Sequence, residues 1–335
     1  MNAVLRDWQG PLRQQLTAEE AYRVDTIVVP LDGSRGTKMA LPVARTLAQV
    51  ERATLHLAYV GERELDPRRA WQHLGLSDED LDGVVLQQLT GMPSRVSGIP
   101  GSPTERPADT SPGPETENGK LEAAAEAILR LVHSLPAALL VMSTHSAGQH
   151  SRATLGPLVD AVLRSAPTRI VLVNPERGEV SWPIHRVVLA HDGSPTSDFA
   201  IPLTADLAQR AGAEVTALHV AARKSSRAME PGSLPAPRYL DQPQHEWPRW
   251  AGEFVERMMA LGAPPAAVNF KLLVTGGQPG SEIAQFTRDH HADLAVVAWH
   301  GHWQAQRLGA VKVVVRRAGC PVLLICAPQK AVASG

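Results

Sequence analysis

Short, almost uninterrupted apolar runs recur along the chain and alternate with segments of helical periodicity. In the first half they include VVPL from Val28, ATLHLAYV from Ala53 and AALLVMSTH from Ala137. Continuous apolar runs are typical of strands in parallel sheets, because helices cover both faces of such sheets. The pattern therefore predicts a doubly wound α/β fold, in which ligands bind at the carboxyl ends of the strands.

The pattern occurs twice in the same order. VVPLDGS runs from Val28 to Ser34 and VVLAHDGS from Val187 to Ser194, and each is followed by a helical run, a further strand and a TG dipeptide. Several shared features in one order indicate internal duplication. We therefore expect two tandem domains, each with a five-stranded parallel sheet. The predicted boundaries are a tail at 1–22, a first domain at 23–176 and a second at 184–328.

Two local features of the repeat carry structural expectations. The DGS segment is typical of an Asx-type turn into a helix, with Asp32 or Ser34 able to cap it. A proline follows each aspartate by ten residues, at Pro42 and Pro202. Both prolines fall within the helical pattern, so we expect each to bend its helix or to free a carbonyl group.

The stretch from about 92 to 118 departs from the repeat. It is rich in Pro, Ser, Gly and Thr and has almost no large apolar residues. Such a segment buries too little surface to offset its ordering entropy, so we predict a mobile loop inserted in the first domain. The alternative is a segment that docks on a partner.

The charge and composition of the chain exclude several classes of function. The formal net charge is −1, so no basic field favours nucleic acid or an acidic membrane. No apolar run approaches the roughly 20 residues of a membrane span. The chain has two cysteines, which excludes a disulfide framework and favours a reducing compartment. We expect a cytoplasmic protein without nucleic-acid or membrane partners.

Known signatures of catalysis are missing from the sequence. It contains no G-x-x-x-x-G-K-[ST] loop and no strand followed by G-x-G-x-x-G. No residues stand in a nucleophile–base pattern, and His290–His291 lacks a spaced set of metal ligands. We assign no catalytic residue and no metal, and an ATP-hydrolysing enzyme is the weakest of three functional hypotheses.

Four motifs together carry a resemblance to a known family. They are the DGS turns, the second-strand runs Leu55-His56-Leu57 and Leu218-His219-Val220, the loops after the fourth strands, and the Cys-Pro-Val-Leu run from Cys320. On these motifs the chain resembles the universal stress protein family, as a tandem member with the adenine nucleotide alpha hydrolase-like fold. The resemblance implies that the two domains pair through their last strands, Ile170–Val173 and Val322–Ile325, as an intramolecular pseudo-dimer. A homodimer is a further expectation.

The family divides into ATP binders and non-binders. Binders carry Gly-x2-Gly-x9-Gly-[Ser/Thr] after the fourth strand, where glycine N–H groups and a helix N-terminus hold phosphate. The resemblance also implies that the first-strand aspartate and the backbone after the second-strand histidine hold the adenosine. Carried over to the first domain, the tentative nucleotide-binding residues are Asp32, Leu57, Ser143, Ser146, Gly148 and Gly156. The less favoured set in the second domain is Asp192, Val220, Gly301 and Gly309.

Both phosphate loops depart from the binding pattern. In the first domain serines replace two glycines, and Pro157 replaces the hydroxyl residue. In the second domain the loop is two residues shorter, with Trp299 and Trp303 as bulky neighbours. We expect a regulatory, nucleotide-sensing stress protein with weak or absent ATP binding, and ATP is the candidate cofactor. The alternative is a non-nucleotide module that binds an unidentified protein, with Asp32 and Asp192 serving only as turn caps.

Overall fold

A computed structural model describes most of the two repeats. The described residues are 23–60 except Gly33, 84–89, 114–145, 155–165, 169–174, 182–221, 268–301 and 309–327, with the single residues 233, 252, 253, 256 and 303. Of the candidate site residues, Ser146 and Gly148 lie outside this set. The N-terminal tail at 1–22 also lies outside it.

Each repeat forms one unit of alternating strands and helices. Unit 1 consists of β1 (Thr26–Leu31), α3 (Arg35–Lys38), α4 (Leu41–Glu51), β2 (Thr54–Val60), β3 (Val84–Leu89), α6 (Pro114–Ser134), β4 (Ala138–Ser143), α7 (Pro157–Arg164) and β5 (Arg169–Val173). Unit 2 consists of β6 (Arg186–Ala190), α8 (Pro195–Asp198), α9 (Ala200–Ala211), β7 (Glu214–Ala221), β8 (Phe270–Gly276), α11 (Pro279–Asp289), β9 (Leu294–Trp299), α12 (Gly309–Arg317) and β10 (Val322–Cys326).

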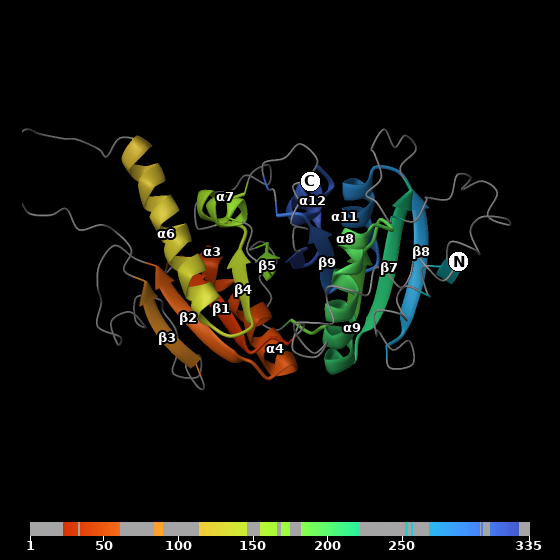
Figure 1. The fold of residues 1–335 in the computed structure, drawn as a ribbon, viewed down its shortest axis with the longest axis horizontal. Helices are drawn as coiled ribbons and strands as arrows, with labels where there is room; N and C mark the ends of the chain where they lie inside the picture. The colour runs from red at the N-terminus through yellow and green to blue at the C-terminus, as the bar shows by residue number, and fades with distance from the viewer. Residues whose placement is uncertain are drawn as a thin grey trace, which may run out of the picture.

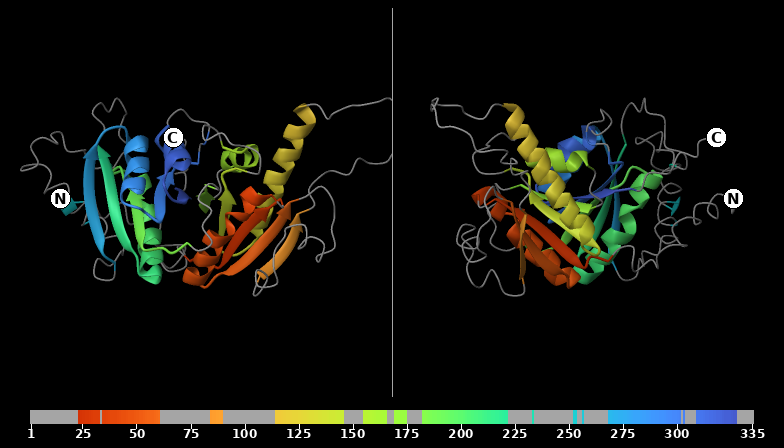
Figure 2. Two further views of the ribbon diagram at one scale, coloured as in Figure 1. Left: turned by 180° about the vertical axis from the view of Figure 1, so that it is seen from behind. Right: turned by 60° about the vertical axis from the view of Figure 1, so that its left-hand side comes forward.

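The described strands form one ten-stranded sheet in the order β3-β2-β1-β4-β5-β10-β9-β6-β7-β8. All strand pairs within a unit are parallel. The only antiparallel pair among them joins the units, with Val322 opposite Leu172 and Leu324 opposite Ile170. Figures 1 and 2 show the units side by side with β5 and β10 in the middle. The predicted fold and the pairing through the last strands are both confirmed.

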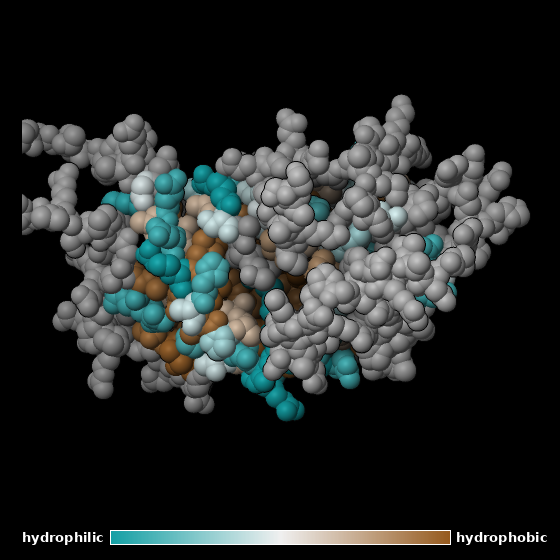
Figure 3. Space-filling model, viewed as in Figure 1, coloured by the Kyte–Doolittle hydropathy of each residue, from teal (hydrophilic) through white to brown (hydrophobic). Residues whose placement is uncertain are grey.

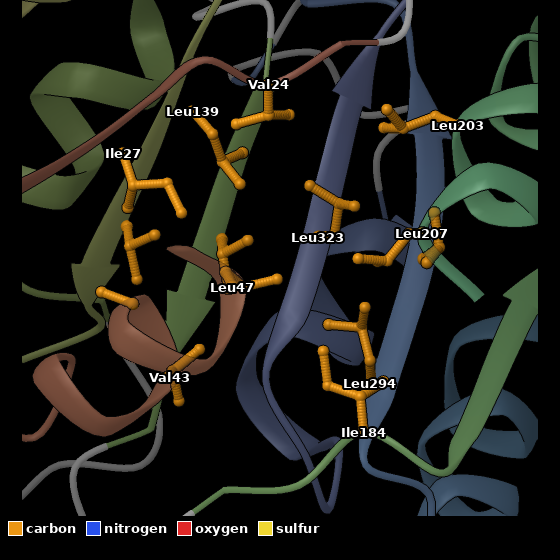
Figure 4. Close-up of a cluster of buried hydrophobic side chains, with 14 of the residues drawn as sticks. Val24, Ile27, Val43, Leu47, Leu139, Ile184, Leu203, Leu207, Leu294 and Leu323 are labelled. Atoms are coloured by element: carbon orange, nitrogen blue, oxygen red, sulfur yellow. The ribbon is translucent and has the colours of Figure 1, made fainter. Parts of the chain in front are cut away.

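Helices cover both faces of the sheet, as the apolar strands predict. One face carries α4 and α9 and the other carries α6, α7, α11 and α12, and each face has its own apolar cluster. The cluster under α4 and α9 runs across the unit boundary, where Leu47 and Leu139 lie in the same cluster as Leu207 and Leu323 (Figure 4). The two units therefore share one continuous core.

In helix α6, the spacing of apolar residues determines which face of the helix packs against the sheet. Its described inward positions, Ala125, Ile128 and Leu129, are buried, whereas Glu126 and Arg130 are exposed and form an i,i+4 pair at 2.7 Å. The outward face of this helix is hydrophilic in Figure 3.

The start of α6 corrects one prediction. Residues 114–118, expected in the mobile loop, are the first residues of α6, and Pro114 is tolerated there because it needs no N–H partner. The rest of that segment lies outside the described residues.

Pro42 and Pro202 were expected to bend their helices or to free a carbonyl group, and each lies just after a break in the helix. In each unit the helical pattern divides into two helices, and the proline lies in the first turn of the second one. The residues at the breaks, Met39, Ala40 and Phe199, keep right-handed helical backbone angles, so each proline removes the hydrogen bond that an N–H would donate to the carbonyl four residues back. The short helices α3 and α8 remain separate elements that continue the DGS turns.

Candidate functional site

The turn after β1 uses one oxygen of Asp32. Oδ1 accepts the Ser34 N–H at 2.8 Å and the Thr37 hydroxyl at 2.8 Å. The Ser34 hydroxyl caps α3 by accepting the Thr37 N–H at 3.4 Å. Asp32 is exposed, and its Oδ2 makes no hydrogen bond within the described part of the chain. The predicted Asx turn is present, and half of the carboxylate is still open to a ligand.

The equivalent turn in unit 2 has the same construction. Asp192 Oδ1 accepts the Ser194 N–H at 3.0 Å and the Ser197 hydroxyl at 2.6 Å. Burial raises the pKa of Asp192, but the hydrogen bonds from Ser194 and Ser197 outweigh it and lower the pKa overall. Gly193 between them has φ of 80°, a left-handed conformation that favours glycine. Both aspartates therefore act first as turn-forming groups.

A buried His–Asp pair supports the turn in unit 2 alone. His191 Nδ1 accepts the Gly193 N–H at 3.0 Å, so Nε2 carries the proton and donates to Asp198 Oδ1 at 3.0 Å. Both side chains are almost fully buried. Unit 1 has Leu31 and Lys38 in the corresponding places. Sequence reasoning missed this pair, although its signal was present as a histidine and an aspartate at the two ends of HDGSPTSD.

The turn in unit 2 also reaches the loop after β9. The Thr196 hydroxyl lies 3.3 Å from both ring nitrogens of His300. His219 Nδ1 donates to the His191 carbonyl at 3.0 Å, which ties β7 to the end of β6. The carboxyl ends of β6, β7 and β9 thus meet in one polar cluster, as expected at the switch point of a doubly wound sheet.

The second-strand register corrects one candidate residue. Leu31 pairs with Tyr59 and Ala190 with Leu218, so the next positions place Asp32 beside Val60 and Asp192 near Val220. Leu57 instead pairs with Val29 and is fully buried. The equivalence of Leu57 with Val220 is therefore wrong.

The counterpart of the unit 2 run in unit 1 is Ala58-Tyr59-Val60. The sequence alignment of the two units was misleading because each second strand contains one histidine. When the units are aligned by strand pairing, His56 and His219 are offset by three positions and are not equivalent. His56 Nδ1 is buried without a hydrogen-bond partner among the described residues, and burial lowers the pKa of this histidine. Val60 replaces Leu57 as the position beside the aspartate.

Two polar groups at the described ends of the loop after β4 have partners within the same chain segment. The hydroxyl of buried Ser143 donates to the His145 carbonyl at 3.0 Å. The Gly156 N–H donates to the Thr144 carbonyl at 2.8 Å. The Ser143 hydroxyl and the Gly156 N–H are therefore both already engaged within this segment.

Helix α7 begins directly after this loop and keeps free donors at its start. Gly156 is the N-cap and makes no side-chain cap, and Pro157 occupies the first helical position without an N–H. The N–H groups of Leu158 and Val159 come next and have no partner within the described residues. Such groups, together with the helix dipole, favour an anion.

Aromatic side chains fill the corresponding region of unit 2. Trp299 ends β9, is 1% exposed and meets Trp303 edge-on with ring centroids 5.9 Å apart. Gly301 lies between them with φ of 78°, and Gly309 is exposed as the first residue of α12. Trp303 Nε1 donates to Asp160 Oδ1 of unit 1 at 2.8 Å. The unit 2 loop is thus tied to unit 1.

Metal ligands and membrane-spanning helices are two further features that the described residues could have carried. Across the described ranges, no group of three or more His, Cys, Asp or Glu side chains is arranged to hold a metal ion. Within those ranges, no helix is long and apolar enough to cross a membrane. Neither Cys320 nor Cys326 forms a disulfide.

Comparisons with known proteins place the chain in context. Residues 23–174 and 183–325 each match the model of the universal stress protein family. Universal stress protein Rv1996 of Mycobacterium tuberculosis H37Rv is 29% identical over 202 residues, which are 57% of this chain and 60% of that relative. The chain thus spans less than two thirds of the length of the curated relatives that it matches.

Two solved structures share the whole architecture. A universal stress protein from Archaeoglobus fulgidus is 12% identical, with a TM-score of 0.55 over 92% of this chain and 98% of that one. A functionally unknown protein from Pseudomonas aeruginosa PAO1 is 14% identical, with a TM-score of 0.56 over 92% and 94%. At these identities the likeness concerns the fold.

Proposed function

Because the chain belongs to the universal stress protein family, we propose that it is a regulatory stress protein whose unit 1 binds an adenine nucleotide weakly. ATP is the ligand that we favour. In this proposal Asp32 and the backbone of Val60 contact the nucleoside, and the start of α7 contacts the phosphates. A cytoplasmic location and a homodimer stay predictions.

The observation that carries the proposal is the start of α7. The N–H groups of Leu158 and Val159 have no partner among the described residues, and they stand at the positive end of a helix. The exposed Oδ2 of Asp32 supports it, because a carboxylate oxygen without a partner suits a ribose hydroxyl. Unit 1 thus offers donors for phosphate and an acceptor for the sugar.

The same region explains why we expect weak binding. Pro157 supplies neither an N–H nor a hydroxyl, and the Gly156 N–H is already used by Thr144. One lost hydrogen bond to a charged group corresponds to roughly 1.5–3 kcal/mol, or about 10- to 150-fold in affinity. We therefore place the affinity of unit 1 below that of family members with the full glycine pattern.

One observation favours a second candidate, a protein-interaction module without a nucleotide. The hydroxyl of Ser143 and the N–H of Gly156 are satisfied within the loop, and Trp299 and Trp303 are buried in unit 2. Groups that already have partners need no ligand to satisfy them. On this alternative the tandem fold presents its surface to an unidentified protein.

Titration calorimetry with ATP tests the choice. The wild type should release heat, Asp32→Ala should weaken binding, and the matched variant Asp192→Ala should leave it unchanged. Adenine absorbance in the supernatant of the denatured, purified protein would add support. Binding lost only in Asp192→Ala would move the site to unit 2, and no heat in any variant would leave the interaction module ahead.

A further inference from the structure

Trp303 links unit 2 to the first turn of α7 in unit 1. It comes from the loop after β9 and is 3% exposed. Its Nε1 donates to Asp160 Oδ1 at 2.8 Å, and Lys312 Nζ of α12 lies 5.4 Å from the centroid of its ring. Figure 1 shows α7 and α12 on the same face of the sheet, on either side of the joint between β5 and β10. Trp303 therefore bridges these two helices.

Asp160 lies at the end of α7 to which we assign the phosphates. A carboxylate in this first turn suits the helix dipole, but it would repel a phosphate held by the Leu158 and Val159 N–H groups. Both of its oxygens have partners elsewhere. Oδ1 accepts from Trp303, and Oδ2 lies 3.4 Å from Arg164 Nε, one turn further along the helix. The two contacts hold the carboxylate toward unit 2 and the later turn.

We infer that Trp303 is a positioning residue for phosphate binding in unit 1, an inference that rests on the proposed function. By holding the Asp160 carboxylate, it keeps negative charge away from the N–H groups at the start of α7. The loop of unit 2, two residues shorter than the family pattern, then serves the site of the other unit. A purely structural role for Trp303 makes a different prediction, because loss of packing would affect every ligand of unit 1 alike.

The test compares ATP with adenosine, which lacks the phosphates, by calorimetric titration of the full chain. Trp303→Phe keeps an aromatic ring but removes the N–H donor, and it should weaken ATP binding by about 3- to 10-fold while adenosine binding stays unchanged. Asp160→Asn removes the charge and should strengthen ATP binding by a similar factor. The double variant should bind ATP as Asp160→Asn does, because there is no longer a charge to position.

Several results would overturn the inference. Trp303→Phe could leave ATP binding unaltered, or it could weaken ATP and adenosine equally, and either outcome excludes a positioning role. If thermal denaturation shows that Trp303→Phe is unfolded, Arg164→Gln, which frees the other oxygen of the same carboxylate, replaces it, and ATP affinity unchanged in that variant rejects the inference. The inference is also rejected if the wild type binds ATP no more tightly than it binds adenosine. A wild type that binds neither ligand rejects the proposed function itself, and the inference with it.

Discussion

Arg210 Nη1 lies 2.8 Å from Glu51 Oε2, across the boundary between the two units. Glu51 is the last residue of α4 and its side chain is 4% exposed, whereas Arg210 comes from the last turn of α9. Burial raises the pKa of Glu51 to about 7, although Arg210 lowers it in part. Asp206 on α9 raises it further, and Arg169 on β5 lowers it. This glutamate therefore titrates near neutral pH.

The first prediction concerns stability against pH. Between the ordinary pKa of 4.5 and the folded value of about 7, the folded chain holds a proton that the unfolded chain has released. The free energy of unfolding should therefore fall as the pH rises through this window, by up to about 3 kcal/mol. Urea unfolding at a series of pH values measures the slope. Glu51→Gln should flatten it, whereas Glu126→Gln, at an exposed glutamate, should not. A slope that Glu51→Gln leaves intact would contradict the prediction.

The second prediction concerns the buried pair His191–Asp198. Asp198→Ala leaves the buried His191 Nε2–H without its acceptor, so we expect a loss of about 3 kcal/mol in the free energy of unfolding. Lys38→Ala, the corresponding change in unit 1, should cost less than about 0.5 kcal/mol. His191→Leu together with Asp198→Ala should recover part of the loss, since it removes both polar partners. Equal effects at positions 38 and 198 in chemical denaturation would count against this account.

The third prediction concerns the contact between α11 and α12. A Cβ atom on Gly280 would lie 2.8 Å from both the Ala310 carbonyl oxygen and the Val313 Cβ. Gly280→Ala should therefore force the helices apart and cost about 1–3 kcal/mol. Gly119→Ala is the matched control in α6, where nothing lies within 4 Å of the added atom, and it should stabilise the protein by about 0.5–1 kcal/mol. Thermal unfolding of both variants checks the opposite signs.

The fourth prediction concerns Pro157. Pro157→Ser adds an N–H and a hydroxyl at the start of α7, so ATP should bind about tenfold more tightly. Pro195→Ser makes the same change at the first residue of α8 in unit 2 and should leave ATP binding as in the wild type. Calorimetric titration compares the three proteins. Equal gains in both variants would show that the effect does not arise at α7.

Much of the fold follows from local pattern. The apolar strands and the repeated DGS turns were enough to predict two five-stranded sheets, because parallel strands covered on both faces leave a plain signal in the sequence. The form of the break before Pro42 was harder to foresee, because Met39 and Ala40 keep helical backbone angles while their N–H groups bond to Gly36 and Thr37, only three residues back.

The site was harder to predict than the fold. Leu57 was the wrong residue to place beside Asp32, because the single histidine in each second strand suggested a false alignment of the two units. Only the strand pairing shows that Val60 takes this position. The bond from Trp303 to Asp160 joins residues 143 positions apart and leaves no periodic trace. Contacts of this kind depend on how the units meet, which the sequence pattern does not encode.

The antiparallel joint between β5 and β10 has an evolutionary consequence. In a homodimer of identical subunits, every substitution appears on both sides of the two-fold axis. Here one chain supplies both halves, so Glu51 faces Arg210 while the corresponding positions in the other unit are Ala211 and Val50. Because the two halves belong to one chain, a substitution in one half has no copy in the other. The contact between Arg210 and buried Glu51 on one face of the joint, and the indole N–H of Trp303 on the other, each have no symmetric counterpart among the described residues.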